Sequence, residues 1–104
     1  MLFRSVTMQP TIADALTAPA TGAVPLELLR GRLDAVVVLD EDELAAGFRL
    51  AYARGRVACE VAGSAPIGAL AAGRVDAAGA RNVVCVVSGG NIDPALAARL
   101  LSSG

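Results

Sequence analysis

The sequence contains no lysine and no histidine, and all nine of its basic residues are arginines. Without lysine the chain cannot form a Schiff base through an amine side chain, and without histidine it lacks the commonest general base and metal ligand. These absences exclude Schiff-base and histidine-dependent catalysis by this chain alone.

Strong charge, long apolar runs and cysteine motifs are missing as well. A net charge of −1 gives no electrostatic footprint for nucleic acid or an anionic membrane. No apolar run approaches the roughly 18 residues that span a bilayer, and residues 1–6 do not follow a signal-peptide pattern. Cys59 and Cys85 form neither a CxxC motif nor a metal-ligand spacing, which favours two buried thiols. We therefore expect a cytoplasmic protein that has no nucleic-acid, membrane or metal partner.

What the chain has in abundance is aliphatic residues, since 55% of it is hydrophobic and only 3% is aromatic. This composition predicts a packed core rather than disorder. A length of 104 residues allows one domain at most, with a small margin of stability if it folds alone.

Two nearly continuous apolar runs, at residues 34–39 and 82–87, are predicted to be strands that are covered on both faces of a sheet. Residues 1–23 are predicted to be irregular. Asp40, Ser64 and Asp93 are the expected N-caps of helices, and Gly55 and Gly73 are the expected helix stops. The predicted helices cover residues 24–30, 41–54, 65–72 and 94–101. Strands separated by helices indicate an α/β unit with parallel strands.

The helix over residues 41–54 is expected to bury an apolar face formed by Leu44, Phe48, Ala51 and Tyr52. The acidic run at residues 40–43 lies at its start, where carboxylates complement the helix dipole. We interpret this run as a cap rather than a metal site.

The strongest local pattern is a strand, then the loop Ser88-Gly89-Gly90-Asn91, then a helix. Ligands bind beyond the carboxyl ends of strands in open α/β sheets, and glycines allow close approach to the backbone. A plain strand-to-helix turn would give the same pattern. Glu60, between two apolar residues, is either a partly buried functional carboxylate or an exposed turn acid. Thr11 and Asp14 could simply cap a turn.

Taken together and in order, these segments resemble the serine/threonine dehydratases of the fold-type II pyridoxal-phosphate (PLP) class, which includes threonine ammonia-lyase and serine racemase. The family patterns are T-I-A-D-G, an acidic stretch after D-D-V-V, V-E-P-A-G, and V-x-V-x-S-G-G-N-V-D. They match residues 11–15, 33–43, 59–63 and 84–94, so that the resemblance spans about residues 11–101.

This resemblance implies that the chain is the C-terminal third of a tryptophan synthase β-like domain, with residues 1–104 forming one partial domain. It implies that Ser88 hydrogen-bonds the pyridine nitrogen of PLP, and that Gly89 and Gly90 let the ring lie against the backbone. Glu60 matches the glutamate beside the ring. Ala15 stands where the family has a glycine near the cofactor.

The sequence departs from the family at several points. Ala15 replaces a glycine and Val61 replaces a proline. The family's cofactor lysine, catalytic serine, phosphate-binding loop and cation ligands have no counterpart here. The complete enzyme would convert L-threonine or L-serine to a 2-oxo acid and ammonia. Whether this chain is an enzyme at all stays open. We expect it to be inactive alone and not to bind PLP by itself, because it holds one wall of the pocket.

Three hypotheses follow. The chain is part of a dehydratase, with a small amino acid as the substrate of the complete enzyme and a homodimer as one possible assembly. Alternatively, it is a short non-catalytic protein that binds a full-length dehydratase, or a decayed remnant of one. Finally, it could be a small α/β domain that binds an amino-acid-type ligand.

Overall fold

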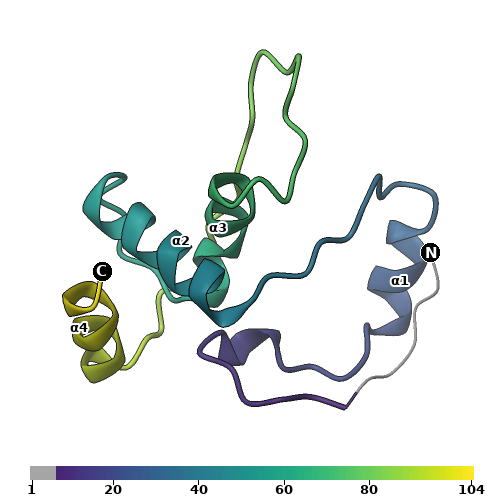
Figure 1. The fold of residues 1–104 in the computed structure, drawn as a ribbon. Helices are drawn as coiled ribbons and strands as arrows, with labels where there is room; N and C mark the ends of the chain where they lie inside the picture. Colours follow the sequence, from purple (N-terminus) through teal and green to yellow (C-terminus); the bar gives the residue numbers. More distant parts are fainter. Residues whose placement is uncertain (1–6) are drawn as a thin grey trace.

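The computed structural model describes residues 7–104 as a set of short helices joined by long extended segments. The prediction about residues 1–6 lies outside the described residues. Figure 1 shows α2 and α3 crossing at the centre, α4 beside α2, and α1 apart from the rest. The helices are α1 (Ala23–Leu29), α2 (Glu41–Ala53), α3 (Ala65–Ala71) and α4 (Pro94–Ser102), with 3-10 turns η1 (Asp14–Leu16) and η2 (Ala62–Ser64). All four predicted helices are confirmed to within one residue at each end.

The starts of α2 and α4 form as their sequences predict. The Asp40 carboxylate accepts a hydrogen bond from the Glu43 backbone N–H at 2.8 Å. In turn, the Glu43 carboxylate accepts one from the Asp40 backbone N–H at 3.0 Å. Asp93 accepts a hydrogen bond from the backbone N–H of Ala95 at 2.9 Å. The pair of hydrogen bonds at α2 and the single one at α4 satisfy backbone N–H groups that have no partner within the helix itself.

Two other predictions about helix ends need correction. Ser64 precedes α3, but its hydroxyl donates to the Val61 carbonyl at 3.0 Å and caps nothing. A glycine that ends a helix is expected to have a positive φ. Gly55 follows α2, but the residue with the positive φ, at 56°, is Arg56. A side chain at position 55 would stand 2.8 Å from the Ala51 carbonyl oxygen, so Gly55 is needed for close approach. Gly73, with φ of 71°, ends α3 as predicted.

The core centres on one face of α2, which packs on Ala13, Cys59, Val61 and Leu100. Ala65 and Ile67 of α3 pack against this core, where α3 crosses α2. A Cβ atom on Gly47 of α2 would stand 2.6 Å from the backbone nitrogen of Gly68 in α3, so the two helices meet backbone to backbone. The predicted face of α2 is buried at Leu44, Phe48 and Ala51. Tyr52, predicted to share that face, is instead 46% exposed, which corrects that prediction.

The predicted parallel strands are absent from residues 7–104, which corrects the sheet part of the fold prediction. Residues 34–39 and 82–87 make no backbone–backbone hydrogen bond with any described residue. A strand exists only when a neighbour supplies the other half of the hydrogen-bonded ladder. The local sequence favours an extended backbone, but this chain does not provide that neighbour.

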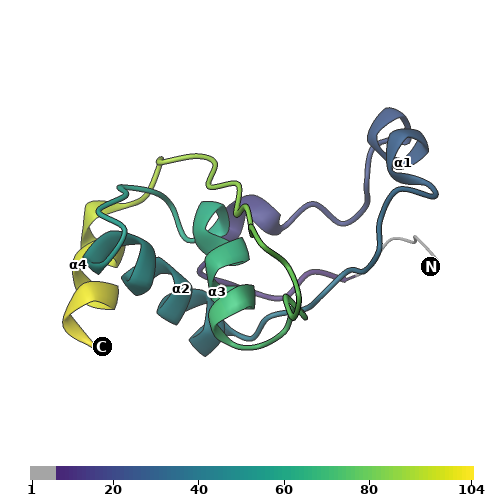
Figure 2. The same ribbon diagram turned by 90° about the horizontal axis from the view of Figure 1, so that it is seen from above.

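The molecule exposes far more surface than a finished domain of its mass. Its exposed area is 7499 Å², whereas a 10.4 kDa monomer is expected to expose about 5400 Å². Its radius of gyration is 14.5 Å, against about 13 Å for a compact domain of this length. Figure 2 shows why, because α1 projects to one side on extended connections. No helix among the described residues is long and apolar enough to cross a membrane.

Candidate functional site

The loop at residues 88–90 lies directly against the segment at residues 58–63. The backbone N–H of Glu60 donates to the carbonyl oxygen of Gly89 at 3.2 Å. A side chain on Gly63 would collide with the Ser88 carbonyl oxygen, so only glycine fits there. The two segments that resemble the dehydratase family therefore touch, although 24 residues lie between Gly63 and Ser88.

The Glu60 side chain occupies the open face of Gly89. Gly89 has φ of 76°, a left-handed conformation that favours glycine. A Cβ atom at this position would collide with the Glu60 carboxylate and would stand 2.9 Å from its Cδ. Glu60 is half-buried rather than exposed, and its functional role stays a prediction.

Ser88 and Gly90 complete an open edge beside Glu60. Ser88 is exposed, and its hydroxyl takes part in no side-chain hydrogen bond among the described residues. The nearest heavy atom to a Cβ on Gly90 would be the Ala58 carbonyl oxygen, 3.8 Å away. A free hydroxyl, bare glycine backbone and a carboxylate therefore line one edge. This donor set fits one wall of a site for a flat aromatic cofactor, and the sequence has no lysine to attach one.

Ala15 lies on η1, which packs against η2, the turn that begins two residues after Glu60. Ala15 itself is exposed. The structure thus brings its element close to the segment that carries Glu60. Within residues 7–104, the backbone of Ala15 makes no hydrogen bond with the backbone of Ser88 or Glu60.

Glu41 was not singled out by sequence reasoning, which treated residues 40–43 only as a helix cap. Its carboxylate accepts hydrogen bonds from the Thr11 hydroxyl and, at 2.9 Å, from the Ile12 N–H. Thr11 therefore does more than cap a local turn, because it ties the segment before η1 to the start of α2. Nothing local could reveal this pairing, since the partners are 30 positions apart.

Cys59, which directly precedes Glu60 in the chain, is buried. Burial raises the pKa of the Cys59 thiol, a hydrogen bond with Ser64 opposes the rise, and the neighbouring Glu60 charge adds to it. A thiol held protonated is a poor nucleophile. The expectation of a buried thiol is met at Cys59, while Cys85 is half-buried.

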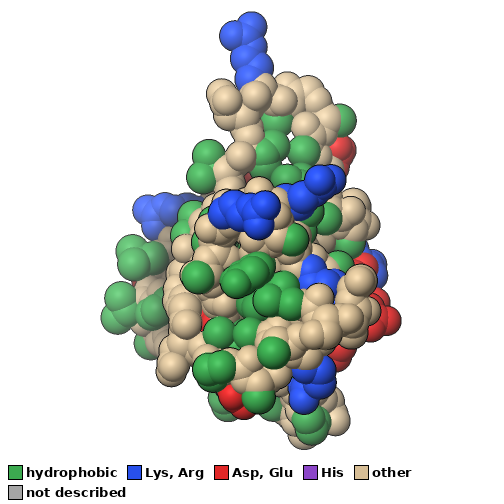
Figure 3. Space-filling view, turned by 90° about the vertical axis from the view of Figure 1, so that its left-hand side faces the viewer, with side chains coloured by type: hydrophobic (Ala, Val, Ile, Leu, Met, Phe, Trp, Pro, Cys, Tyr) green, Lys and Arg blue, Asp and Glu red, His purple; other side chains and the backbone are tan. Residues whose placement is uncertain are grey.

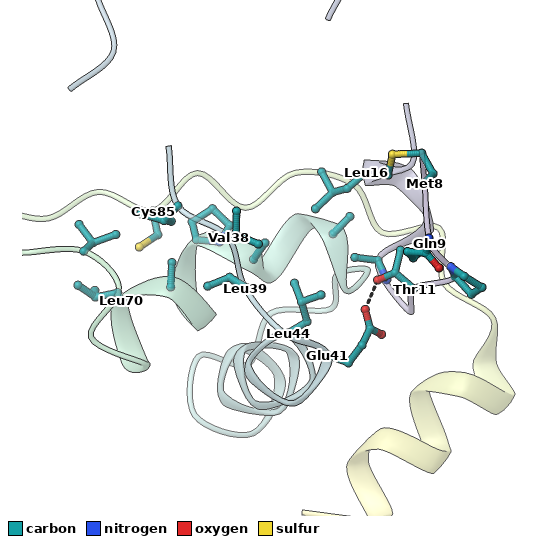
Figure 4. A pocket seen from close by; sticks show the side chains of 18 of the residues that line it. Met8, Gln9, Thr11, Leu16, Val38, Leu39, Glu41, Leu44, Leu70 and Cys85 are labelled. Atoms are coloured by element: carbon teal, nitrogen blue, oxygen red, sulfur yellow. Dashed lines mark hydrogen bonds between the residues drawn. The ribbon is translucent and has the colours of Figure 1, made fainter. Parts of the chain in front are cut away.

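A separate apolar groove of about 810 Å³ is lined by residues of α2, of α3 and of the extended segments before and after them. Figure 4 shows Val38, Leu39, Leu44, Leu70 and Cys85 around it, with Glu41 and Thr11 joined at one end. Ser88, Gly89, Gly90 and Glu60 do not line it. The groove is thus distinct from the predicted cofactor wall. No cluster of three or more acidic, cysteine or histidine side chains suited to a metal occurs in residues 7–104.

Comparison with known proteins gives consistent relatives, although no family model matches the chain. An L-threonine ammonia-lyase of Thermotoga maritima is 30% identical over 92% of this chain and 23% of its own length. A putative threonine dehydratase of Sinorhizobium fredii is 42% identical over 83% of this chain and 26% of its own length. A phenylserine dehydratase of Ralstonia pickettii is 35% identical over 90% of this chain and 29% of its own length.

The chain thus spans about a quarter of the length of the curated relatives that it matches. The matched stretch includes the residues that bring Glu60 and the Ser88 loop together. Relatives named L-threonine ammonia-lyase or L-threonine dehydratase match a similar extent of the chain, between 80% and 92% of it. The chain is a threonine dehydratase-like sequence that corresponds to the C-terminal part of those enzymes.

Proposed function

We propose that this chain supplies one wall of the PLP site of a fold-type II threonine/serine ammonia-lyase. In this proposal residues 1–104 form one partial domain, and the complete cytoplasmic enzyme converts L-threonine or L-serine to a 2-oxo acid and ammonia. The observation that carries the proposal is the contact between Glu60 and Gly89. It joins two sequence segments that the family also has, around a free hydroxyl and an open glycine edge.

Each residue of the edge has a distinct role in the proposal. Ser88 donates or accepts a hydrogen bond at the pyridine nitrogen of PLP, since its hydroxyl has no partner within the described part of the chain. Gly89 and Gly90 leave room for the ring against the backbone. Glu60 lies beside the ring and is held there by the bare face of Gly89. Ala15 borders the site from η1.

PLP, when bound, supplies an electron sink for the elimination of water from a β-hydroxy amino acid. A neutral serine hydroxyl leaves the pyridine nitrogen largely unprotonated, which suits elimination more than reactions that demand a stronger sink. Threonine and phenylserine, the amino acids in the names of two relatives, are both β-hydroxy amino acids. They support a β-hydroxy amino acid as the substrate class of the complete enzyme.

The isolated chain is expected to be inactive, because none of its 104 residues is a lysine that could attach the cofactor. The purified chain, mixed with PLP and L-threonine, should release no more ammonia than PLP in buffer. Release above that control would contradict the proposed division of labour between this chain and the rest of the enzyme.

A chimaera tests the proposal in a complete enzyme. This chain would replace the matching region of the Sinorhizobium fredii relative, and ammonia release from L-threonine and L-serine would be measured. We expect activity, and we expect Ser88→Ala to lower kcat by roughly ten-fold or more, because one hydrogen bond to a reacting group is lost. Ser103→Ala, near the end of the chain, is the matched control. A chimaera that folds and releases no ammonia would contradict the proposal.

The apolar groove favours a second candidate function, which is binding of a dehydratase polypeptide without catalysis. Glu41 is the one charged side chain among the described residues that line the groove, and its carboxylate already accepts two hydrogen bonds. A free amino acid carries two charges that such a lining could not match. The groove therefore suits an apolar polypeptide better than an amino-acid-type ligand.

A further inference from the structure

One carboxylate organises the segment that leads into η1. The two oxygens of Glu41, the first residue of α2, accept hydrogen bonds from different donors, the Thr11 hydroxyl and, at 2.9 Å, the Ile12 N–H. The Thr11 oxygen in turn accepts a hydrogen bond from the Ala13 N–H at 3.1 Å. Figure 4 shows the Thr11–Glu41 hydrogen bond from close by. Three successive residues before η1 therefore depend on one side chain of α2.

Glu41 makes this connection through hydrogen bonds and not through an ion pair. The ion pairs found within residues 7–104 involve Glu27 and Glu43 and not Glu41. Arginine is plentiful, since the chain has nine, and Figure 3 shows arginine side chains at several places on the surface. Hydrogen bonds to a carboxylate are strong and directional, whereas exposed ion pairs contribute little. The Glu41 carboxylate is thus suited to fixing the position of the Thr11 segment.

The Thr11 segment leads directly into the core beside Glu60. Ala13 is 1% exposed and belongs to the same buried cluster as Cys59 and Val61, the two residues that flank Glu60. η1 begins at the next residue and packs against η2, the turn that meets the carbonyl oxygen of Ser88. The start of α2 is therefore connected to both segments of the candidate site, through one buried residue and two turns.

Little else holds η1 in place. It is a 3-10 turn of three residues, all of them exposed, and its N-cap, Ala13, supplies no side-chain hydrogen bond. A single turn gains too few hydrogen bonds to be stable by itself. On the N-terminal side of η1 the burial of Ala13 and the hydrogen bonds to Glu41 are the two anchors that the described residues provide.

We propose that Glu41 and Thr11 are positioning residues for the PLP site. They hold η1, with Ala15, at the border of the site and support the segment that carries Glu60. This inference rests on the function proposed above and deepens it. In this proposal neither residue touches cofactor or substrate, and both act through η1. Loss of their hydrogen bond should therefore weaken binding at the site and leave the chemical step nearly unchanged.

Glu41→Gln and Asp42→Asn form a matched pair of substitutions. Each replaces a carboxylate in the first turn of α2 by an amide of the same shape, and each removes the same charge from the start of the helix. The carboxylate of Asp42 is exposed and takes part in no hydrogen bond or ion pair of a side chain within residues 7–104. An amide offers one acceptor oxygen where Glu41 uses two. Effects of charge are thus common to the pair, and only Glu41→Gln breaks the contact with the Thr11 segment.

The chimaera described above gives the kinetic test, with PLP in excess and ammonia release from L-threonine as the signal. We expect Glu41→Gln and Thr11→Val to raise KM at least about five-fold and to change kcat less than about two-fold. Thr11→Ser keeps the hydroxyl and should restore the KM of the unaltered chimaera. Asp42→Asn should leave KM within about two-fold. If Glu41→Gln fails to fold, the comparison of Thr11→Val with Thr11→Ser decides the question.

Two further measurements do not depend on turnover. In the isolated chain, the amides of Ile12 and Ala13 should exchange roughly ten-fold faster in Glu41→Gln than in Asp42→Asn, because their hydrogen bonds depend on Glu41. In the chimaera, the dissociation constant for PLP, measured by absorbance, should rise at least about three-fold in Glu41→Gln and stay unchanged in Asp42→Asn. Equal amide exchange in the two variants would overturn the proposal at its first step.

The outcomes separate this proposal from the proposed function. An active chimaera in which the tie-breaking variants lower the melting temperature, with KM and PLP affinity unchanged, would overturn the positioning role and leave the proposed function standing. A folded chimaera that binds PLP and releases no ammonia would overturn the proposed function. The PLP affinities of Glu41→Gln and Asp42→Asn would then still decide the positioning role, which equal affinities would overturn.

Discussion

Glycines at two positions control how closely the Ser88 loop approaches the Glu60 segment. Gly63 faces the Ser88 carbonyl and Gly89 faces the Glu60 carboxylate, whereas a Cβ atom on Gly90 would make only an ordinary contact with the Ala58 carbonyl oxygen, at 3.8 Å. Sequence reasoning predicted Ser88, Gly89, Gly90 and Glu60 as neighbours only through the family resemblance. Spacing along the chain could not place them together, because the contact depends on how two distant backbones pack.

We predict that Gly89→Ala destabilises the chain by about 1–3 kcal/mol, since alanine resists the left-handed conformation and its methyl group displaces Glu60. Gly90→Ala, where the nearest atom is 3.8 Å away, should cost less than about 0.5 kcal/mol. Urea denaturation followed by circular dichroism measures both. Equal effects of the two substitutions would contradict the described packing.

Cys59 gives a prediction about pH. Because its pKa is raised in the folded chain, its contribution to stability is fully present below the unfolded thiol pKa, about 8.5. It is lost as the pH rises through the higher folded pKa. The free energy of unfolding should therefore fall as the pH rises above about 8.5, and that of the Cys59→Ala variant should fall less. Iodoacetamide should also label Cys85 before Cys59 in the folded chain. Labelling of Cys59 first would contradict its burial.

Among the elements, the predicted helices are present in the structure, and the predicted strands are absent from residues 7–104. The capping box at Asp40 and the cap at Asp93 are local, and their bonds join residues at most three positions apart. Residues 34–39 and 82–87 have the composition of strands, but pairing needs a partner segment. The Thr11–Glu41 tie was missed for a related reason, because it joins residues far apart in sequence.

The crossing of α2 and α3 is the contact between elements that most depends on single atoms. Gly47→Ala would improve helix propensity by about 1 kcal/mol in isolation. In the folded chain its Cβ would stand 2.6 Å from the Gly68 nitrogen, and the helices would have to separate. We expect net destabilisation of at least about 1 kcal/mol, measured by thermal unfolding.

Ala46→Gly provides the comparison for this crossing, because Ala46 is on the exposed face of α2. It should cost only the propensity difference of about 1 kcal/mol. If Gly47→Ala stabilised the chain instead, the close crossing of α2 and α3 would be wrong.

At the scale of the whole molecule, the chain is a group of helices, of which α2 and α4 have side-chain caps, and it carries uncovered apolar surfaces. Two observations agree with this description. The chain has excess exposed area and bare valines, and it matches only about a quarter of each relative. The sequence allowed a prediction of the family and of the helical core. It could not show that the two apolar runs would stay unpaired within residues 7–104, because pairing depends on where a second segment packs in the fold.

The central claim is that residues 34–39 and 82–87 are unpaired apolar segments within the described part of the chain and not parts of a finished sheet. Amide hydrogen exchange of the isolated chain, read by mass spectrometry, tests it most directly. We predict that both segments exchange nearly as fast as an unfolded peptide, while the buried turns of α2 exchange slowly. Protection of both segments to the level of α2 in a monomeric chain would mean that they pair with each other, and it would contradict the claim.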